Sequence, residues 1–317
     1  MKLTLKKTLS IGIPLLLGVF LVWYSLSRIS IPELLVYFKN ADYGWILLAM
    51  FFGLLSHISR AYRWRFQLEP MGYHIKFGNS LMAVFATYLI NYTIPRSGEV
   101  ARATILSNYE GVPFEKGFGT IIAERIADMM VMLIIIGITL ILQFDFIYGF
   151  LTEKFSSTKV LIGIASLVVL FLIGSRLIKK SESKFAIKLK GFVNGLVEGI
   201  TSIFKMKKKW AFIFHTFFIW GMYLLMFYVT TFAISDLENI PTGAILIGFI
   251  LASFSIAATN GGIGSYPEAI VIGFLLFDLP EDPSRAFGWI MWTSQTIMIV
   301  ILGGISLLYL PIFNRKK

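Results

Sequence analysis

The sequence predicts an all-α polytopic membrane protein, and three observations lead to that fold class. The chain of 317 residues is 56% hydrophobic and only 15% charged, and its mean hydropathy is +0.76; soluble domains carry about 25% charged residues. Apolar stretches of about 20 residues, long enough for a helix to cross a bilayer, recur along the chain. Two polar patches with glycine and proline, at 91–102 and 259–268, interrupt this pattern.

Six apolar stretches have the length of spanning helices. They lie at about 8–27, 43–64, 118–142, 158–177, 210–234 and 285–311. The first follows three lysines and lacks a small-residue cleavage site, which favours a retained anchor over a signal peptide. Residues 30–42 have the composition of a short polar connection. The segments 76–107 and 242–278 each predict a broken pair of helices, each too short to cross a bilayer alone.

The distribution of charge predicts that both broken pairs are re-entrant hairpins. The segment 176–209 holds ten basic and two acidic residues, so the positive-inside rule places it in the cytoplasm. That placement, with both termini also inside, requires that each broken pair returns to its side of entry. The hairpins then enter from opposite faces, as in an inverted repeat. A shift of about 166 residues, which aligns Gly98 with Gly264, is consistent with such a repeat.

The remaining composition sets the expected class, location and partners. We expect one integral membrane domain over 1–317, in a prokaryotic cytoplasmic membrane with both termini in the cytoplasm. The net charge of +11 arises between apolar stretches, which predicts contact with anionic lipid headgroups and not with nucleic acid. The absence of cysteine and the isolation of three histidines predict no metal site. We also expect no cofactor, because no P-loop or dinucleotide fingerprint occurs.

The basic segment also carries a periodic apolar pattern. Over 184–204 the apolar residues recur at helical spacing with lysines between them, which favours an amphipathic helix on the inner leaflet. A solvated basic linker is the alternative.

The residues at the two breaks suit tight hairpin turns. Glycine permits left-handed turns and proline suits the first turn of a following helix, and the residues of these types are Pro95, Gly98, Gly261, Gly262, Gly264 and Pro267. The spacing Ser265-x-x-Glu268 matches a capping box. Glu268 is therefore expected to cap a helix, to contact substrate, or both.

The first break is the charged one. Arg96, Glu99 and Arg102 are spaced i, i+3, i+6, so they share one helical stripe. They form either an ion-pair ladder that neutralises itself or, with the N-terminus of the second half-helix, a site for a lipid phosphate. Charges at this depth are costly, which favours a functional role.

Further charged residues lie in the full spans. Glu124 and Asp128 are spaced i, i+4, and Arg125 can reach Asp128. These carboxylates either hold arginines in position or handle protons. Arg60, Arg63 and Arg65 near the end of the second span are expected to set topology and to snorkel, with Arg60 the deepest.

Three motifs in order resemble a known family. They are Asn91…Pro95-Arg96-x-Gly98-Glu99-x-x-Arg102, then Glu124-Arg125-x-x-Asp128, then Gly261-Gly262-x-Gly264…Glu268. Together they resemble the lysylphosphatidylglycerol synthase transmembrane-region family, also called flippase-like domain proteins, over about 8–311. In the multiple peptide resistance factor the similar membrane domain is taken to flip an aminoacylated phospholipid that a separate soluble domain synthesises. The chain ends directly after its last span, so the resemblance implies translocation and not synthesis.

The expected function is therefore a flippase for an anionic, amino-acid-modified or sugar-modified phospholipid or polyprenyl lipid of the cell envelope. We expect the first hairpin to bind the headgroup and the second to shape or gate the cavity. No residue is predicted to be catalytic. The predicted substrate-binding residues are Arg60, Asn91, Arg96, Glu99, Arg102, Glu124, Arg125, Asp128, Asn260 and Glu268.

Two other readings stay open at this point. The chain could be the membrane component of an aminoacyl- or glycosyl-transferring synthase with a separate soluble transferase; Glu99, Glu124 and Asp128 would then be candidate acid–base groups. The sequence thus leaves enzymatic activity open while favouring its absence, and it leaves the oligomeric state open. A solute channel is the weaker reading, because no full span carries a continuous polar face.

Overall fold

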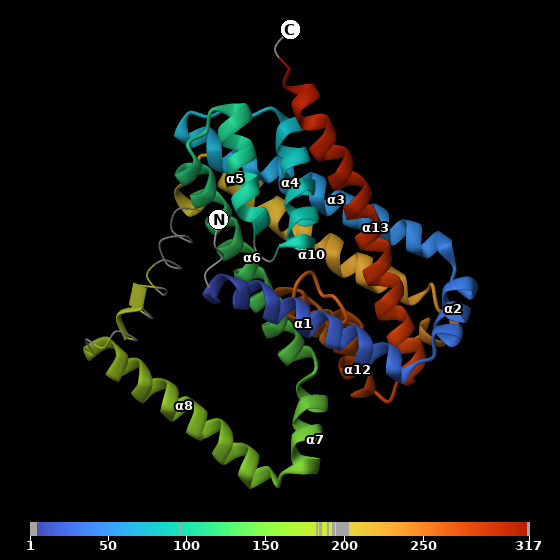
Figure 1. Ribbon diagram of the computed structural model, residues 1–317. Helices are drawn as coiled ribbons and strands as arrows, with labels where there is room; N and C mark the ends of the chain where they lie inside the picture. Colours follow the sequence, from blue (N-terminus) through green and yellow to red (C-terminus); the bar gives the residue numbers. More distant parts are fainter. Residues whose placement is uncertain are drawn as a thin grey trace. The chain divides into compact units, whose positions relative to one another are not determined.

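The computed structural model describes residues 5–94, 97–181, 183, 186–188, 190–191, 194 and 203–315. Within these ranges the chain forms fourteen helices and no strand (Figure 1). This confirms the all-α fold class.

The helices follow the apolar pattern of the sequence. Their bounds are α1 Leu5–Arg28, α2 Ile31–Asn40, α3 Tyr43–Leu68, η1 Glu69–Met71, α4 Phe77–Thr93, α5 Ser97–Glu110, α6 Phe114–Leu142, α7 Phe144–Lys154, α8 Ser157–Lys180, α10 Lys209–Thr231, η2 Ser235–Leu237, α11 Thr242–Ala258, α12 Ser265–Leu275 and α13 Glu281–Phe313. A helix therefore stands at each of the six predicted spans. Four helices in the described part are long and apolar enough to cross a membrane, namely α3 with η1, α6, α10 and α13. Counting the end of α1 and α2 as one span bent by 83° would make five, so the number six stays a prediction.

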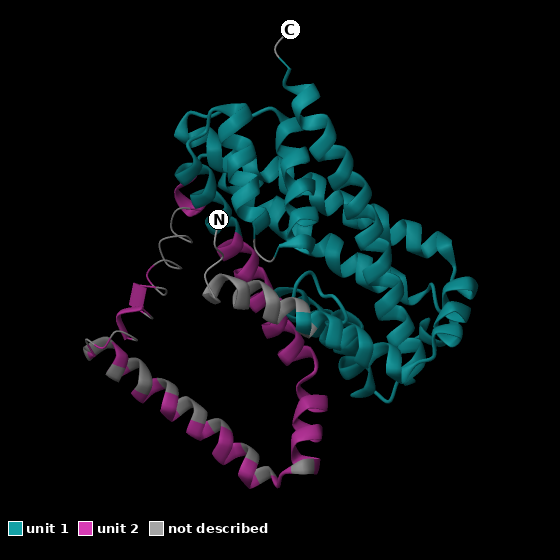
Figure 2. Cartoon of the chain, viewed as in Figure 1, with its two compact units in different colours: residues 1–124, 207–317 teal, residues 125–206 magenta. Residues whose placement is uncertain are grey.

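The chain divides into two compact units (Figure 2). Unit 1 comprises residues 1–124 and 207–317, and unit 2 comprises residues 125–206. Unit 2 holds the later part of α6 together with α7 and α8. The helix predicted over 184–204 lies largely outside the described residues. The single domain over 1–317 stays a prediction.

Both predicted breaks form antiparallel helical hairpins in unit 1. At the base of the first hairpin, α4–α5, the Glu110 carboxylate accepts hydrogen bonds from the Lys76 amide (3.0 Å) and the Asn79 side chain (2.5 Å). At its tip the Gly98 amide donates to Asn91 Oδ1 (2.8 Å). A Cβ on Gly98 would collide with the Thr87 carbonyl oxygen, so only glycine allows this close return.

The second hairpin, α11–α12, also consists of two antiparallel helices joined at a tip. The contacts at its base are apolar. The Thr259 and Ser265 hydroxyls pair at 2.7 Å on either side of the tip. Near the base Gly273 packs directly on the backbone of Gly248. The two hairpins predicted from the interrupted hydropathy are thus present as hairpins; their entry from opposite faces stays a prediction.

The order of helices repeats along the chain. The helices α3, α4, α5 and α6 have counterparts in α10, α11, α12 and α13, which begin 166, 165, 168 and 167 residues later. The counterparts α3 and α10 pack against each other in opposite directions, because Gly53 lies against Met226 while Arg63 contacts Thr216. Antiparallel counterparts are what an inverted repeat requires.

One predicted connection is a helix. Residues 30–42 were expected to form a polar connection, but Ile31–Asn40 forms α2. Ser30 accepts from the Glu33 amide, and the Glu33 carboxylate accepts from the Ser30 amide, which is a complete capping box. The spacing Ser30-x-x-Glu33 was the signal in the sequence.

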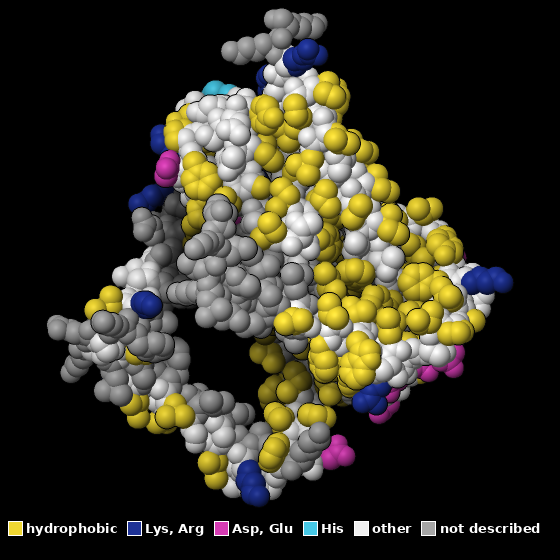
Figure 3. All heavy atoms as spheres, viewed as in Figure 1, with side chains coloured by type: hydrophobic (Ala, Val, Ile, Leu, Met, Phe, Trp, Pro, Cys, Tyr) yellow, Lys and Arg dark blue, Asp and Glu magenta, His cyan; other side chains and the backbone are white. Residues whose placement is uncertain are grey.

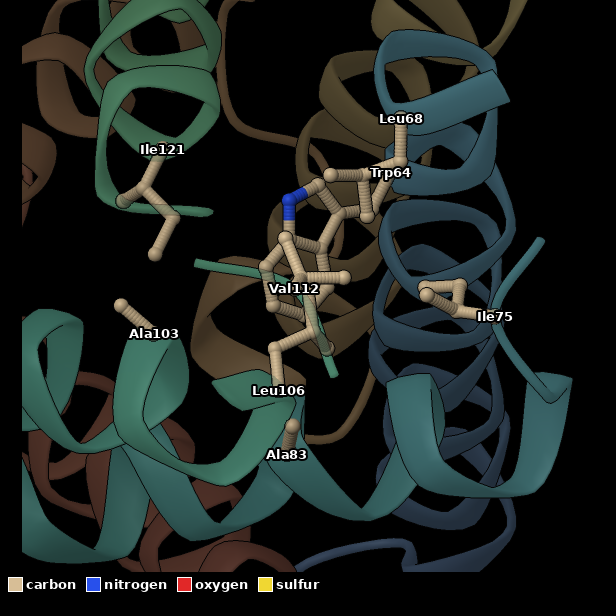
Figure 4. Packing of buried hydrophobic residues seen from close by; sticks show 8 residues of the cluster. All are labelled: Trp64, Leu68, Ile75, Ala83, Ala103, Leu106, Val112 and Ile121. Carbon is tan, nitrogen blue, oxygen red and sulfur yellow. The ribbon is translucent and has the colours of Figure 1, made fainter. Parts of the chain in front are cut away.

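A hydrophobic core next to the first hairpin fixes α3, α5 and α6. Figure 4 shows Trp64 and Leu68 of α3 facing Ala103 and Leu106 of α5 and Ile121 of α6. All five are at most 2% exposed. On the outside, hydrophobic side chains cover much of the visible length of α13 (Figure 3), as expected for a surface that faces lipid. The protein is an integral membrane protein.

Candidate functional site

A buried ionic cluster joins α5, α6 and α3 beside the core. Arg102 Nη1 and Nη2 donate to Glu124 Oε2 and Oε1 at 2.8 and 3.3 Å. Arg63 Nη2 lies 3.7 Å from Glu124 Oε2. The three side chains are 3%, 1% and 0% exposed. The Arg102–Glu124 pair is two-pronged, which gives it directional strength beyond a simple charge contact.

The surrounding side chains hold the arginines in place. The Arg102 guanidinium stacks on the Trp64 ring, with 3.7 Å between Cζ and the ring centroid. Trp64 Nε1 in turn donates to Thr120 Oγ1 of α6 at 2.7 Å. Arg63 Nη1 donates to Thr216 Oγ1 of α10 at 2.9 Å. The cluster therefore ties four helices together.

This geometry gives Arg102 a carboxylate partner outside its own helical stripe. Arg102 pairs with Glu124 of α6, and the expected lipid-phosphate site at the first break stays a prediction. The reading that carboxylates hold arginines is correct for Glu124. Glu99 is half-buried, and Pro95 and Arg96 lie outside the described residues.

Arg63 is a residue that the sequence reasoning missed. It was expected to set topology at the membrane surface, yet its side chain is fully buried. Arg65, two residues later, is half-buried and lies over the Tyr62 ring. Helical spacing was the available signal, because Arg63 lies at i+3 from Arg60 and so shares the face of the predicted deepest arginine.

Arg60 lies beside an aromatic group on the same side of α3. Its side chain is 4% exposed and lies beside Tyr223 of α10. One turn earlier the His57 ring is 4.6 Å from the Tyr88 ring and 5.5 Å from the Phe85 ring, measured between centroids. Arg60 is therefore buried within the helix bundle, and its contact with substrate stays a prediction.

The tips of the two hairpins meet. Asn260 Nδ2 donates to the Tyr92 carbonyl oxygen at 2.8 Å. Trp292 Nε1 of α13 donates to the Gly261 carbonyl oxygen at 2.9 Å. Gly261, Gly262 and Gly264 have φ angles of +65°, +77° and +69°, which L-residues rarely adopt. Asn260 thus serves as a link between the hairpins.

A second ionic cluster lies where α12 meets α13. Arg285 Nε donates to Glu268 Oε1 at 2.9 Å and Arg285 Nη2 donates to Glu281 Oε1 at 2.7 Å. Arg285 is 1% exposed and Glu268 is 12% exposed. Asp282 adds a carboxylate 3.8 Å from Arg285 Nη1.

The predicted capping box at 265–268 was wrong. Gly264 is the N-cap residue in a left-handed conformation, and no side chain caps the helix there. Glu268 therefore lies one position too late to reach back to the cap, and it pairs with Arg285 instead. Arg285 was read as the first residue of a span, so sequence spacing alone gave no sign of this partner.

The predicted substrate-binding residues do not converge on one place. Arg60, Arg102 and Glu124 are brought together near α3, whereas Glu268 belongs to the cluster at α12 and α13. Asn91 and Asn260 hold hairpin tips. In unit 2, Arg125 is exposed and Asp128 is 6% exposed. In the described part of the chain no group of acidic or histidine side chains could hold a metal ion.

The sequence is similar to known membrane proteins. Residues 11–303 match the family described as "Lysylphosphatidylglycerol synthase TM region". The UPF0104 membrane protein MJ1595 of Methanocaldococcus jannaschii is 22% identical over 323 positions, which cover 92% of each chain. The UPF0104 membrane protein PH1989 of Pyrococcus horikoshii is 25% identical over 58% of this chain and 52% of its own. Glycosyltransferase AglD of Haloferax volcanii is 23% identical over 44% of this chain and 23% of its own.

Proposed function

The chain belongs to the lysylphosphatidylglycerol synthase transmembrane-region family, and on this premise we propose that it moves an anionic, amino-acid-modified or sugar-modified lipid between membrane leaflets. The observation that carries the proposal is the pairing of two hairpins whose tips meet at the Asn260–Tyr92 hydrogen bond. Interrupted helices inside a membrane are tolerated where they pack in protein or line a polar path.

The buried charges support the same proposal. Arg60, Arg63 and Arg102 are all more than nine-tenths buried in a bundle with an apolar exterior. A guanidinium keeps its charge when buried and matches the geometry of a phosphate. Charged groups at membrane depth are expensive and are usually retained for function. We propose that a lipid phosphate passes along this face of α3 while its acyl chains stay in the bilayer.

The charge at the two ends of unit 1 supports the proposed orientation. Lys76 lies by the base of the first hairpin, and Lys208 pairs with Glu69 at 2.7 Å. The opposite end carries Asp236, Glu281 and Asp282, which line a cavity of about 740 Å³ with Arg28 and Tyr37. By the positive-inside rule we therefore propose that the first end faces the cytoplasm. No ATP-binding motif occurs in the sequence, so we propose that a gradient, the membrane potential or simple equilibration drives the movement.

The test is scrambling of a fluorescent lipid by the purified full chain in proteoliposomes. Nitrobenzoxadiazole-labelled phosphatidylglycerol is the probe, and dithionite bleaches only the label in the outer leaflet. The triple variant Arg63→Met, Arg102→Met and Glu124→Met should stay folded, because apolar replacement of a whole buried ionic group is often tolerated, and it should scramble much more slowly. Scrambling at the original rate would contradict a role for this cluster in transport.

A matched control is available in the same unit. Lys208 and Glu69 form an ion pair of 2.7 Å whose side chains are 54% and 20% exposed. The double variant Lys208→Met with Glu69→Met removes the same two kinds of charge outside the buried cluster. It should scramble at the original rate.

A second candidate function is the membrane part of a lipid-modifying synthase. The similarity to a protein named a glycosyltransferase favours it. In this reading a separate soluble transferase would deliver the modifying group. Incubating the reconstituted chain with phosphatidylglycerol and the soluble fraction of a cell extract, followed by mass spectrometry of the lipids, tests this reading. A modified lipid that depends on the chain would favour the synthase, and no modified lipid with active scrambling would favour the flippase.

A further inference from the structure

Each hairpin is joined to the long helix that follows it by an arginine–glutamate pair, and the two pairs lie on opposite sides of the joined hairpin tips. We propose that Arg102–Glu124 and Arg285–Glu268 are two latches that close the two ends of a transport path. The inference deepens the proposed function and rests on it, because latches at two ends are what an alternating opening to either leaflet needs.

The first latch closes the α5–α6 seam. Arg102 lies on the second arm of the first hairpin and Glu124 lies on α6, and two hydrogen bonds of 2.8 and 3.3 Å join them. Next to Arg102, Ala103 is fully buried against Gly117 of α6, whose ideal Cβ would lie 3.8 Å from the Ala103 Cα atom. Separation of these helices would therefore uncover Ala103.

The second latch closes the α12–α13 seam with the charges exchanged. Here the glutamate, Glu268, is on the hairpin arm and the arginine, Arg285, is on the following helix. Beside the pair, Pro267 packs so closely on Gly288 that a Cβ there would lie 2.5 Å from the Pro267 Cα atom. Val271 follows Pro267 by one helical turn and is 3% exposed. Separation of α12 and α13 would uncover Val271.

The two latches lie at different levels along α13. Asn314, just after α13, exchanges hydrogen bonds of 2.7 and 2.8 Å with Asn79, which places the base of the first hairpin at the end of α13. Arg285 lies near the beginning of α13, 29 residues earlier, or about 43 Å along a helix. Arg102 precedes Glu110 of the hairpin base by two turns, about 12 Å. Figure 1 shows α4 beside the later half of α13 and α12 beside its beginning.

The joined hairpin tips lie between the latches. Asn260 binds Tyr92, and Gly261 is held between Tyr92 and Trp292 of α13. On the other side Gly264 packs on the backbone of α1 at Leu21 and Val22. The tips are therefore tied at several points, while each seam is closed by one ionic pair in addition to its packing. Motion is expected at the seams, with the tips as the pivot.

The absence of cysteine from the sequence makes a direct test possible. Ala103→Cys and Val271→Cys, each alone in the full chain in proteoliposomes, report on the two seams through their rate of reaction with a maleimide. In the chain with both latches intact, both cysteines should react slowly. Glu124→Gln should raise the rate at Ala103→Cys at least about tenfold, because it removes one charge of a buried pair, and leave the rate at Val271→Cys unchanged. Glu268→Gln should do the reverse.

Each other outcome overturns the latches. No change at either cysteine means that the pairs do not control the seams. Equal acceleration at both cysteines means a general loosening of the fold, which circular dichroism of the same samples would also register. Labelling needs no lipid movement, so a chain that fails to scramble while its seams open separately would overturn the proposed function and not the latches.

Discussion

Arg102 and Glu124 lie 22 residues apart in the sequence and form the most enclosed two-pronged ion pair in the described residues of unit 1, at 3% and 1% exposure. Neither charged side chain can reach water unless α5 separates from α6. The pair therefore couples the position of the first hairpin to the helix that follows it. Any change that removes one partner leaves the other charge buried.

Removal of the carboxylate should be strongly destabilising. Glu124→Ala leaves Arg102 and Arg63 without this partner, and loss of one member of a buried pair typically costs about 3 to 5 kcal/mol. Thermal unfolding in detergent should show a large decrease in Tm. Glu115→Ala, an exposed change in the first turn of the same helix, should change stability by about 0.5 kcal/mol or less. Equal effects of both variants would contradict the importance of the pair.

Two glycines with nearly the same φ angle allow the conformational cost of adding a side chain to be separated from its steric cost. Gly111 lies between α5 and α6, and Gly261 lies at the tip of the second hairpin. Gly111→Ala places a side chain at φ +66° with no atom within 4 Å, so it should cost only about 1 to 2 kcal/mol. Gly261→Ala has nearly the same φ but brings the new Cβ to 2.5 Å from Tyr92 Cε1. Its unfolding free energy should fall further than that of Gly111→Ala. Adding Tyr92→Leu to Gly261→Ala should restore part of the difference; indistinguishable single variants would refute the close packing of the tip.

The carboxylates around Arg285 should differ in importance according to their exposure. Glu268 is 12% exposed, whereas Glu281 and Asp282 are 49% and 53% exposed. Exposed pairs contribute about 0 to 1 kcal/mol, so Asp282→Asn should scarcely alter the Tm, while Glu268→Ala should lower it clearly. Measurement of both variants in one detergent gives the order. A larger effect of Asp282→Asn would show that Glu268 is not the principal partner.

The role of Arg96 is predicted from the sequence alone, because Arg96 lies outside the described residues. Arg96→Ala should abolish scrambling in proteoliposomes and leave folding intact, since the proposed role is to bind the lipid headgroup. Arg65→Ala, on half-buried Arg65 of α3, is the control and should retain scrambling. Unchanged scrambling by Arg96→Ala would remove this residue from the proposed path.

The sequence was enough to predict where the helices lie but not which side chains contact each other. Hydropathy located helices at all six predicted spans and located both hairpins, because apolar length and glycine-containing breaks are local properties. The capping box at Ser30 and Glu33 was also local, but it was overlooked. The glycine that begins α12 moved Glu268 out of capping register, since a one-residue shift in a helix start changes which side chains reach the cap.

The partners of the charged residues could not be predicted because they depend on packing between distant helices. Arg63 and Arg65 look equivalent in the sequence, but a helix turns by about 200° over two residues, so only Arg63 faces the cluster. Glu268 and Arg285 pair because Gly288 lets α12 approach α13 closely. A glycine within an apolar span gave no sign of that approach.

The antiparallel packing of α3 on α10 bears on the origin of the chain. Two identical half-length chains that associated about a twofold axis would bring the same helix of each copy face to face, as α3 and α10 are here. The packing of α3 on α10 is thus the packing expected of two fused copies of a half-length chain. Fusion would free each copy from the need to match the other, as the unlike pair Arg63 and Thr216 across this interface illustrates.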